Sequence, residues 1–424
     1  MILVPNDEII SPRLLKLKEV LEKEEDKKGH VDVFWKEIEE KGAPIIEQIE
    51  REPNHKLVTF LCKENGDTDE IFLYSGSLGV IPHRGKFARL QGTDIYYKSI
   101  FYLNKTRITY AIIRQKVNIP LYPPKDIIIP IVKGDSLNKK NFIWLPGITL
   151  AILELPDAPS QPWIEKKDNI PKGTLKTVRL KSTKFNEKFY IKVYLPPNYN
   201  PSTDPYGSLF LFDGFMYNNP NQIPTPTILD NLIFSKKIPP IIAVFIYNKI
   251  DEGMKARTNE LNTNPDFAFF VGEELLPHLK ENYNLSDNPE KTILGGASLG
   301  GLSASYIGLK YPNKFAKILS QSGSYWAPEK LGEDTDPYFQ NWQYLIGEYM
   351  KREKLPLDFY LEIGAYEGKE ALHGSPSHFF SNRHFRDVLL SKGYSVKYVE
   401  FIGGHNFICW RGTLADGLIY LIGL

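Results

Sequence analysis

Two helical patterns of hydrophobic residues open this chain of 424 residues. Residues 11–28 place four leucines among charged side chains, which predicts a short amphipathic helix that ends at Gly29. Residues 30–43 form a second helical stretch that carries Phe34 and Trp35. We interpret the first helix as a solvated support rather than as a partner site.

The pattern then changes to short β-type runs between residues 45 and 114, separated by turn residues, among them KLVTFLC, DIYYKSIFYL and RITYAII. Strands this close together, with no helices between them, indicate an antiparallel β-sandwich of immunoglobulin-like type. Residues 155–173 are dense in proline and charge, which is typical of a domain boundary. We therefore expect an amino-terminal domain over residues 1–165.

From residue 174 onward, buried-type strands alternate with helices, as in SLFLFDG, IIAVFIY, KTILGG, FAKILSQSG, DFYLEIG and SVKYVEFIG. This alternation indicates a mostly parallel sheet covered by helices on both faces, after an opening antiparallel pair of strands. The second domain, residues 174–424, is thus predicted to have an α/β-hydrolase fold.

The candidate nucleophile is Ser298, the central residue of a G-x-S-x-G pentad. An apolar strand precedes the pentad, and a helical run that stops at Pro312 follows it. This context predicts a sharp strand-to-helix turn that presents the serine hydroxyl at the carboxyl end of the sheet.

A serine hydroxyl needs a base, and His405 occupies the expected place for one. It follows the last predicted strand, after two glycines, and precedes the terminal helix, as the order serine, acid, histidine requires. The other histidines, including His378 and His384 beside the preceding helix, have no such placement. For those two we expect a core or surface role.

The acid of the triad should follow the strand DFYLEIG. Glu367 and Glu370 lie just beyond this strand, whereas Asp358 and Glu362 lie on it. A carboxylate beyond the strand can reach the imidazole from behind and fix its tautomer, so Glu367 is the preferred candidate. A solvated loop glutamate, with the acid supplied elsewhere, is the alternative.

An oxyanion hole needs two backbone N–H groups, and the sequence offers them at Leu299 and Phe215. Leu299 follows the nucleophile, and Phe215 belongs to the Asp213-Gly214-Phe215 turn after an earlier strand. Arg257 follows another strand on the same rim and is a candidate substrate-binding residue. It could instead pair with Glu260 and have only a structural role.

Composition narrows the function further. The charges balance to +1 with no long basic run, so neither nucleic acid nor a membrane surface is an expected partner. The two cysteines, Cys62 and Cys409, fall in different predicted domains and suggest neither a disulfide framework nor a cysteine metal site. The amino terminus does not have the pattern of a signal peptide, so we expect a cytoplasmic protein. We expect no cofactor.

Six segments of the second domain stand out: VYLPPNY at 193–199, LFDG at 211–214, R-x-x-E-L at 257–261, GGASLGGLSA at 295–304, SQSGSYWA at 320–327 and GGHNFICWRG at 403–412. Together they resemble the enterochelin (enterobactin) esterases, an esterase D-like family of α/β-hydrolases. The amino-terminal part is also similar to that family's first module. The resemblance implies Ser298 as nucleophile, His405 as base and Glu367 at the position of the acid.

The same resemblance implies a function: cleavage of the ester or trilactone backbone of a catecholate siderophore, free or as its ferric complex, to release iron. The substrate would be a small-molecule ester that brings its own metal. Two alternatives stay open from the sequence. One is a general aromatic-acyl esterase or acyltransferase of the same fold, and the other is a siderophore-binding protein without catalysis.

Overall fold

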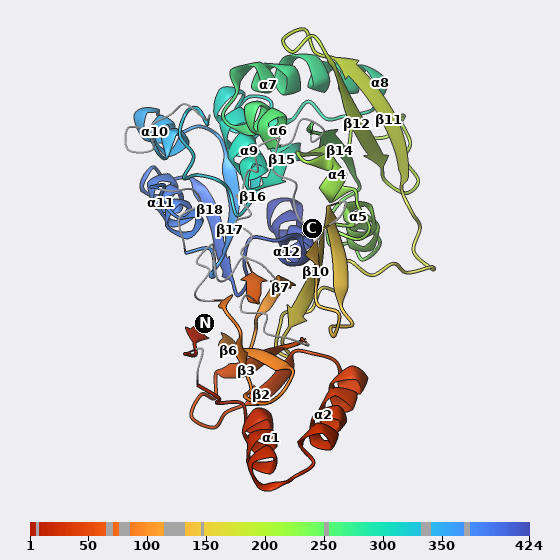
Figure 1. The fold of residues 1–424 in the computed structure, drawn as a ribbon. Helices are drawn as coiled ribbons and strands as arrows, with labels where there is room; N and C mark the ends of the chain where they lie inside the picture. Colours follow the sequence, from red (N-terminus) through yellow and green to blue (C-terminus); the bar gives the residue numbers. More distant parts are fainter. Residues whose placement is uncertain are drawn as a thin grey trace. The chain divides into compact units, whose positions relative to one another are not determined.

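The computed structural model describes residues 1–5, 8–64, 71–75, 85–113, 132–145, 148–249, 254–331, 341–368 and 374–424 (Figure 1). These residues form two compact units. The first contains the described residues up to Pro159 together with the short segment Ile402–Asn406, and the second contains those of Ser160–Phe401 and Phe407–Leu424.

The first unit begins with two helices, α1 (Pro12–Lys23) and α2 (Lys27–Lys41). Our prediction of one helix ending at Gly29 was wrong, because Gly29 lies inside α2. The side chain of Asp26 caps this second helix by accepting a hydrogen bond of 2.9 Å from the Gly29 N–H. Apolar residues of both helices pack with Leu61, Ile95 and Tyr97 in one buried cluster.

Two five-stranded sheets complete the first unit. The first contains β1 (Ile2–Leu3), β2 (Ile45–Gln48), β3 (His55–Lys63), β5 (Ala88–Arg89) and β6 (Ile95–Leu103). The second contains β4 (Phe72–Ser75), β7 (Arg107–Ile113), β8 (Val132–Lys133), β9 (Asn141–Leu145) and β10 (Ile148–Glu154). All described pairings are antiparallel except that of β8 with β10. The rings of Phe60 and Tyr110, one from each sheet, pack edge to face with their centroids 4.7 Å apart.

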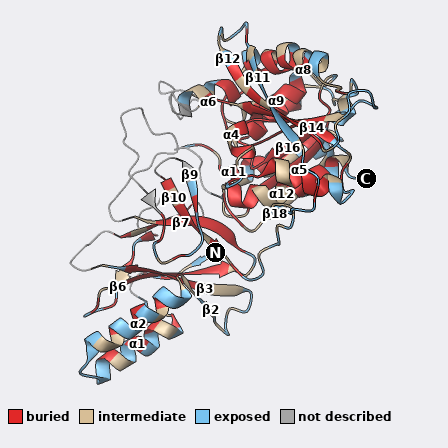
Figure 2. Cartoon of the chain, turned by 90° about the vertical axis from the view of Figure 1, so that its right-hand side faces the viewer, coloured by how far each residue is buried: buried red, intermediate tan, exposed pale blue. Residues whose placement is uncertain are grey.

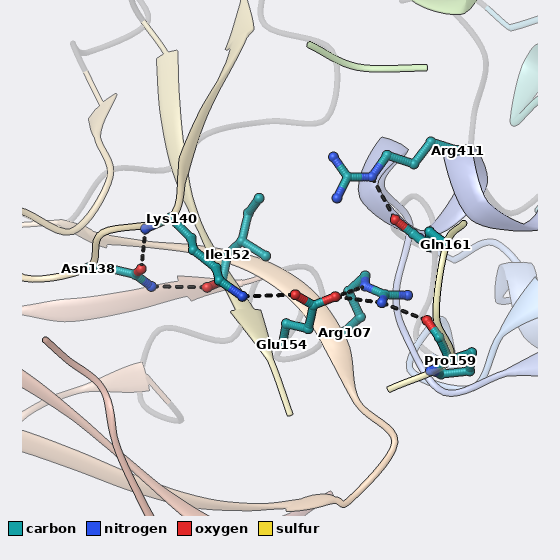
Figure 3. Close-up of polar contacts among 8 residues, drawn as sticks. All are labelled: Arg107, Asn138, Lys140, Ile152, Glu154, Pro159, Gln161 and Arg411. Atoms are coloured by element: carbon teal, nitrogen blue, oxygen red, sulfur yellow. Dashed lines mark hydrogen bonds and ion pairs between the residues drawn. The ribbon is translucent and has the colours of Figure 1, made fainter. Parts of the chain in front are cut away.

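Glu154, the last residue of β10, links two cations of the first unit (Figure 3). Its Oε1 accepts hydrogen bonds from Arg107 Nε at 2.8 Å and Nη2 at 2.5 Å, and its Oε2 accepts one from Lys140 Nζ at 3.0 Å. Arg107 Nη2 also donates to the carbonyl of Pro159 at 2.7 Å. These contacts fix the end of the first unit to the strand β7.

The second unit is built on an eight-stranded sheet in the order β11-β12-β14-β13-β15-β16-β17-β18. Its strands are β11 (Thr174–Lys181), β12 (Lys188–Leu195), β13 (Gly207–Leu211), β14 (Ile241–Tyr247), β15 (Thr292–Ala297), β16 (Lys317–Gln321), β17 (Asp358–Gly364) and β18 (Ser395–Phe401). The two pairings made by β12 are antiparallel and the other five are parallel. This sheet confirms the predicted α/β-hydrolase architecture.

The described helices of this unit are α4 (Gly214–Tyr217), α5 (Thr225–Phe234), α6 (Met254–Leu261), α7 (Pro265–Phe269), α8 (Leu276–Asn282), α9 (Leu299–Lys310), α10 (Tyr344–Lys351), α11 (His378–Ser391) and α12 (Phe407–Ile422). Eleven of the twelve residues of α9 are buried, and Figure 2 shows this helix in the buried colour. In the described part of the chain, no helix has the length and apolar character to span a membrane.

The helical stretch that follows α6 is interrupted in the structure. Between α7 and α8 lies a π-helical turn, η1 (Phe270–Leu275), and a 3₁₀ turn, η2 (Pro289–Lys291), follows α8. Pro277 has no N–H to donate into a regular α-helix, which accounts for the widened turn before it. The carbonyl of Gly272 within the turn accepts a hydrogen bond from Lys314 Nζ at 3.0 Å.

Candidate active site

Ser298 lies at the sharp turn between β15 and α9, with φ of 59° and ψ of −122°. A non-glycine residue holds such a conformation only where its surroundings enforce it, and such strain is concentrated at functional sites. Two glycines allow the turn. A Cβ on Gly296, the first pentad glycine, would lie 2.7 Å from the Gly300 carbonyl carbon, and one on Gly301, directly after the pentad, would lie 2.5 Å from Ser320 Oγ. Glycine at these two positions therefore follows from the close approach of strand and helix.

The hydroxyl of Ser298 lies 3.1 Å from that of Ser324, a residue of the segment after β16. Ser324 Oγ is in turn 3.4 Å from His378 Nε2, at the first position of α11. Trp326 Nε1 donates a 2.9 Å hydrogen bond to the same His378 nitrogen. Because an indole N–H can only donate, His378 Nε2 must be the unprotonated, accepting nitrogen.

Sequence reasoning missed Ser324 and His378. His378 is buried, as expected, but its ring is part of the hydrogen-bonded surroundings of Ser298. The available signal was the SQSGSYWA segment at 320–327, which the resemblance included without a role for any of its residues. His384, by contrast, is an exposed residue whose Nδ1 contacts Gln343 Oε1 at 2.5 Å, in keeping with a surface role.

Glu367 lies beyond β17, and two hydrogen-bond donors hold its carboxylate. Its Oε1 accepts hydrogen bonds from the Ser322 hydroxyl at 2.7 Å and from the Gly364 N–H at 2.9 Å. Trp410 Nε1 donates to Ser322 Oγ at 3.1 Å and so fixes that hydroxyl. The carboxylate is only 7% exposed, so its position is set by these contacts rather than by solvent.

His405 lies in the loop between β18 and α12. The strand β18 is the parallel neighbour of β17, the strand that leads to Glu367. One side-chain ligand atom each of Glu367, His378 and His405 lie within 4.8 Å of one another. Two histidines and a carboxylate could coordinate a divalent cation. Each of these groups can equally well serve in proton transfer to and from a serine.

The other acid candidates are placed differently. Asp358 begins β17, at the end of the strand opposite to Gly364, and is exposed. Glu362 is fully buried, and its Oε1 accepts from Thr413 Oγ1 at 2.5 Å and from Gln321 Nε2 at 2.9 Å. Burial raises the pKa of Glu362 to about 8. Glu370 lies outside the described residues.

The two candidate oxyanion donors lie at helix starts. Leu299 is the first residue of α9, and Phe215 is the second residue of α4, so neither N–H has a partner within its own helix. The two helices are close at this point, because a Cβ on Gly300 would lie 3.5 Å from Asp213 Oδ2. The first turns of α4 and α9 are therefore neighbours beside Ser298.

Arg257 forms a bidentate ion pair with Asp213, through Nε to Oδ1 at 2.6 Å and Nη2 to Oδ2 at 2.5 Å. Asp213 is fully buried and Arg257 is 5% exposed. We expected Arg257 either to meet substrate or to pair with Glu260. In the structure its guanidinium instead binds Asp213, the first residue of the Asp213-Gly214-Phe215 turn.

Comparisons with known proteins identify the family of the chain. A family model described as "Putative esterase" matches residues 182–421. An iron(III) enterobactin esterase of Dickeya dadantii is 26% identical over 439 residues, which cover 92% of this chain and 93% of the relative. An iron(III) enterobactin esterase of Escherichia coli O6:H1 is 31% identical over 294 residues, which cover 69% of this chain and 68% of that protein.

Solved structures give the same picture. The crystal structure of the enterobactin esterase of Shigella flexneri in the presence of enterobactin matches with a TM-score of 0.69 and 25% sequence identity, covering 90% of this chain and 95% of that one. The chain belongs to the enterochelin (enterobactin) esterase family of α/β-hydrolases, and it is a carboxylic ester hydrolase.

Proposed function

We propose that this enzyme hydrolyses the ester or trilactone backbone of a catecholate siderophore, free or as its ferric complex, through an acyl-enzyme on Ser298. The observation that carries the proposal is the strained turn that presents Ser298, in a chain 31% identical to an iron(III) enterobactin esterase. Iron enters as part of the substrate, and cleavage of the backbone serves to release it.

In the first half of the reaction, Ser298 Oγ attacks the ester carbonyl carbon while His405 takes the hydroxyl proton. The N–H groups of Leu299 and Phe215 stabilise the oxygen that becomes negative. The bond to the leaving alkoxide then breaks, and His405 returns its proton to that oxygen. The first cleavage of a trilactone opens the ring and leaves its linear chain on Ser298.

In the second half, His405 takes a proton from water, which attacks the acyl carbon. The bond to Ser298 Oγ breaks, the serine recovers its proton, and a free carboxyl group is released. One water is consumed for each ester cut. Glu367 stabilises the imidazolium of His405 in both halves, with its own position fixed by Ser322 and Gly364.

We also propose that residues 1–165 form an immunoglobulin-like β-sandwich domain, separate from a catalytic domain at 174–424, in a cytoplasmic enzyme. The two sheets of the first unit and the contact of Phe60 with Tyr110 between them support the sandwich. The resemblance to a cytoplasmic family supports the location.

The experiment is incubation with ferric and with iron-free enterobactin, followed by mass spectrometry of the products. We expect linear fragments that gain 18 Da for each ester cut, one water per bond, and no fragments from Ser298→Ala. Tight binding of the ferric complex without cleavage would favour a binding protein, and transfer of the acyl group to an added alcohol in preference to water would favour an acyltransferase. Either result would contradict the proposal.

A further inference from the structure

The turn that carries Phe215 begins with an unusual backbone conformation at Asp213. This residue has φ of 54° and ψ of 45°, in the left-handed region that residues with a side chain rarely adopt. The next residue, Gly214, packs against β14 so tightly that a Cβ would lie 2.7 Å from the Phe245 carbonyl carbon. The direction of the following N–H groups therefore depends on what holds Asp213.

The backbone of Asp213 is held by a chain of two hydrogen bonds. Its N–H donates to Asn248 Oδ1 at 2.8 Å, and Asn248 Nδ2 donates to Glu260 Oε2 at 2.7 Å. Asn248 directly follows β14, which runs parallel to β13, the strand that leads into Asp213. Because the amide of Asn248 is fixed at both ends, its oxygen is held toward Asp213 and its nitrogen toward Glu260.

The side chain of Asp213 is held separately, by the bidentate pair with Arg257. Arg257 and Glu260 both belong to α6, three residues apart, so they lie on the same side of one helix. All four residues, Asp213, Asn248, Arg257 and Glu260, are at most 5% exposed. The helix α6 thus holds Asp213 in two ways. Arg257 binds its carboxylate directly, and Glu260 holds its backbone N–H through Asn248.

We propose that Asn248, Arg257 and Glu260 are positioning residues that direct the Phe215 N–H at the oxyanion of the tetrahedral intermediate. This inference rests on the proposed function of Ser298 and explains the R-x-x-E-L segment at 257–261, to which the reaction itself gives no role. The arginine and the glutamate of that segment are the two groups that reach Asp213, one directly and one through Asn248.

The competing explanation is that these residues only stabilise the fold. A second buried asparagine serves as the control that distinguishes this explanation from a positioning role. Asn231 on α5 is also buried, and its Nδ2 donates two hydrogen bonds, to the carbonyls of Trp163 at 2.7 Å and Glu165 at 2.9 Å. Asn248→Ala and Asn231→Ala each remove two buried hydrogen bonds. Only Asn248 is bonded to the turn before Phe215.

The test measures kcat and KM on p-nitrophenyl butyrate and the inhibition constant of phenylboronic acid, which forms a tetrahedral adduct with a reactive serine. We expect Asn248→Ala to lower kcat about 10- to 100-fold with KM within about threefold, because a misdirected donor weakens binding of the transition state. The inhibition constant should rise by a similar factor. Asn231→Ala should change neither kcat nor the inhibition constant by more than about threefold.

A second pair of variants serves if Asn248→Ala does not fold. Glu260→Gln keeps an oxygen that can accept from Asn248, so it should retain kcat within about threefold, whereas Glu260→Ala should lose about 10-fold or more. Wild-type kcat and boronic-acid inhibition in Asn248→Ala or Glu260→Ala would overturn this inference. If Ser298→Ala still hydrolyses the ester, the proposed function itself fails, so the two failures are distinguishable.

Discussion

The hydroxyl oxygens of Ser298 and Ser324 lie 3.1 Å apart, and the second hydroxyl lies 3.4 Å from His378 Nε2. Since that nitrogen accepts from Trp326, it does not donate to Ser324. Ser324 thus lies between the nucleophile and an accepting nitrogen of His378. Ser324 thereby helps to fix the rotamer of Ser298 in the free enzyme.

Ser324→Ala should therefore lower kcat about 3- to 10-fold, because the nucleophile loses one of the contacts that orient it. Ser305→Ala is the matched control, since its hydroxyl pairs with that of Tyr325 at 2.8 Å within the core. Steady-state kinetics on one ester substrate compares the two variants. A kcat for Ser324→Ala equal to or above that of the wild type would contradict this role.

Glu367→Gln should lower kcat at least 100-fold, because a neutral amide cannot stabilise the imidazolium that forms on His405. Glu362→Gln is the control. This second glutamate is buried against Thr413 and Gln321, and its change should leave kcat within about threefold. The opposite ranking of the two variants would assign the acid to Glu362.

The two histidines should also differ. His405→Ala should lower kcat on the order of 1,000-fold, as expected for loss of the general base. His378→Ala should lower kcat by less than about 10-fold, because its Nε2 already accepts a hydrogen bond from Trp326. A larger loss in His378→Ala than in His405→Ala would contradict this assignment and favour transfer of the serine proton through Ser324 to His378.

The buried carboxyl of Glu362 should make the protein less stable as pH rises. Below pH 4.5 this carboxyl is neutral in both the folded and the unfolded chain. Above that value the unfolded chain ionises first, and stability falls until the pH passes the folded pKa of about 8. Urea unfolding at pH 5 and pH 8 should show that Glu362→Gln lessens this fall by on the order of 3 kcal/mol, whereas Glu281→Gln at an exposed site should not. An equal fall in wild type and Glu362→Gln would contradict the prediction.

The fold of the second unit follows from sequence because its signals are local. Buried strands alternate with helices, and the glycines around Ser298 are needed for one close approach between β15 and α9. The π-helical turn before α8 is harder to predict from sequence, since a helix can accommodate a proline in its first turn in several ways. The end of α1 was predicted wrongly because Asp26 caps the start of α2, and this capping contact outweighs the tendency of Gly29 to end a helix.

The contacts around the candidate site are less predictable. Ser324 and Trp326 lie in the segment after β16 and His378 begins α11, and only the sheet order brings these segments beside Ser298. The same is true of Arg257, whose partner proved to be Asp213, 44 residues away, rather than a neighbour on its own helix. Periodicity locates strands and helices, but it carries no information on which polar side chains meet across them.

The central claim is that Ser298 forms the acyl-enzyme, and intact-protein mass spectrometry after treatment with a fluorophosphonate tests it most directly. We expect one adduct per chain in the wild-type enzyme, located on Ser298 by peptide mapping, and none in Ser298→Ala. Ester turnover should disappear with the adduct. Labelling of another residue, or undiminished ester cleavage by Ser298→Ala, would contradict the account.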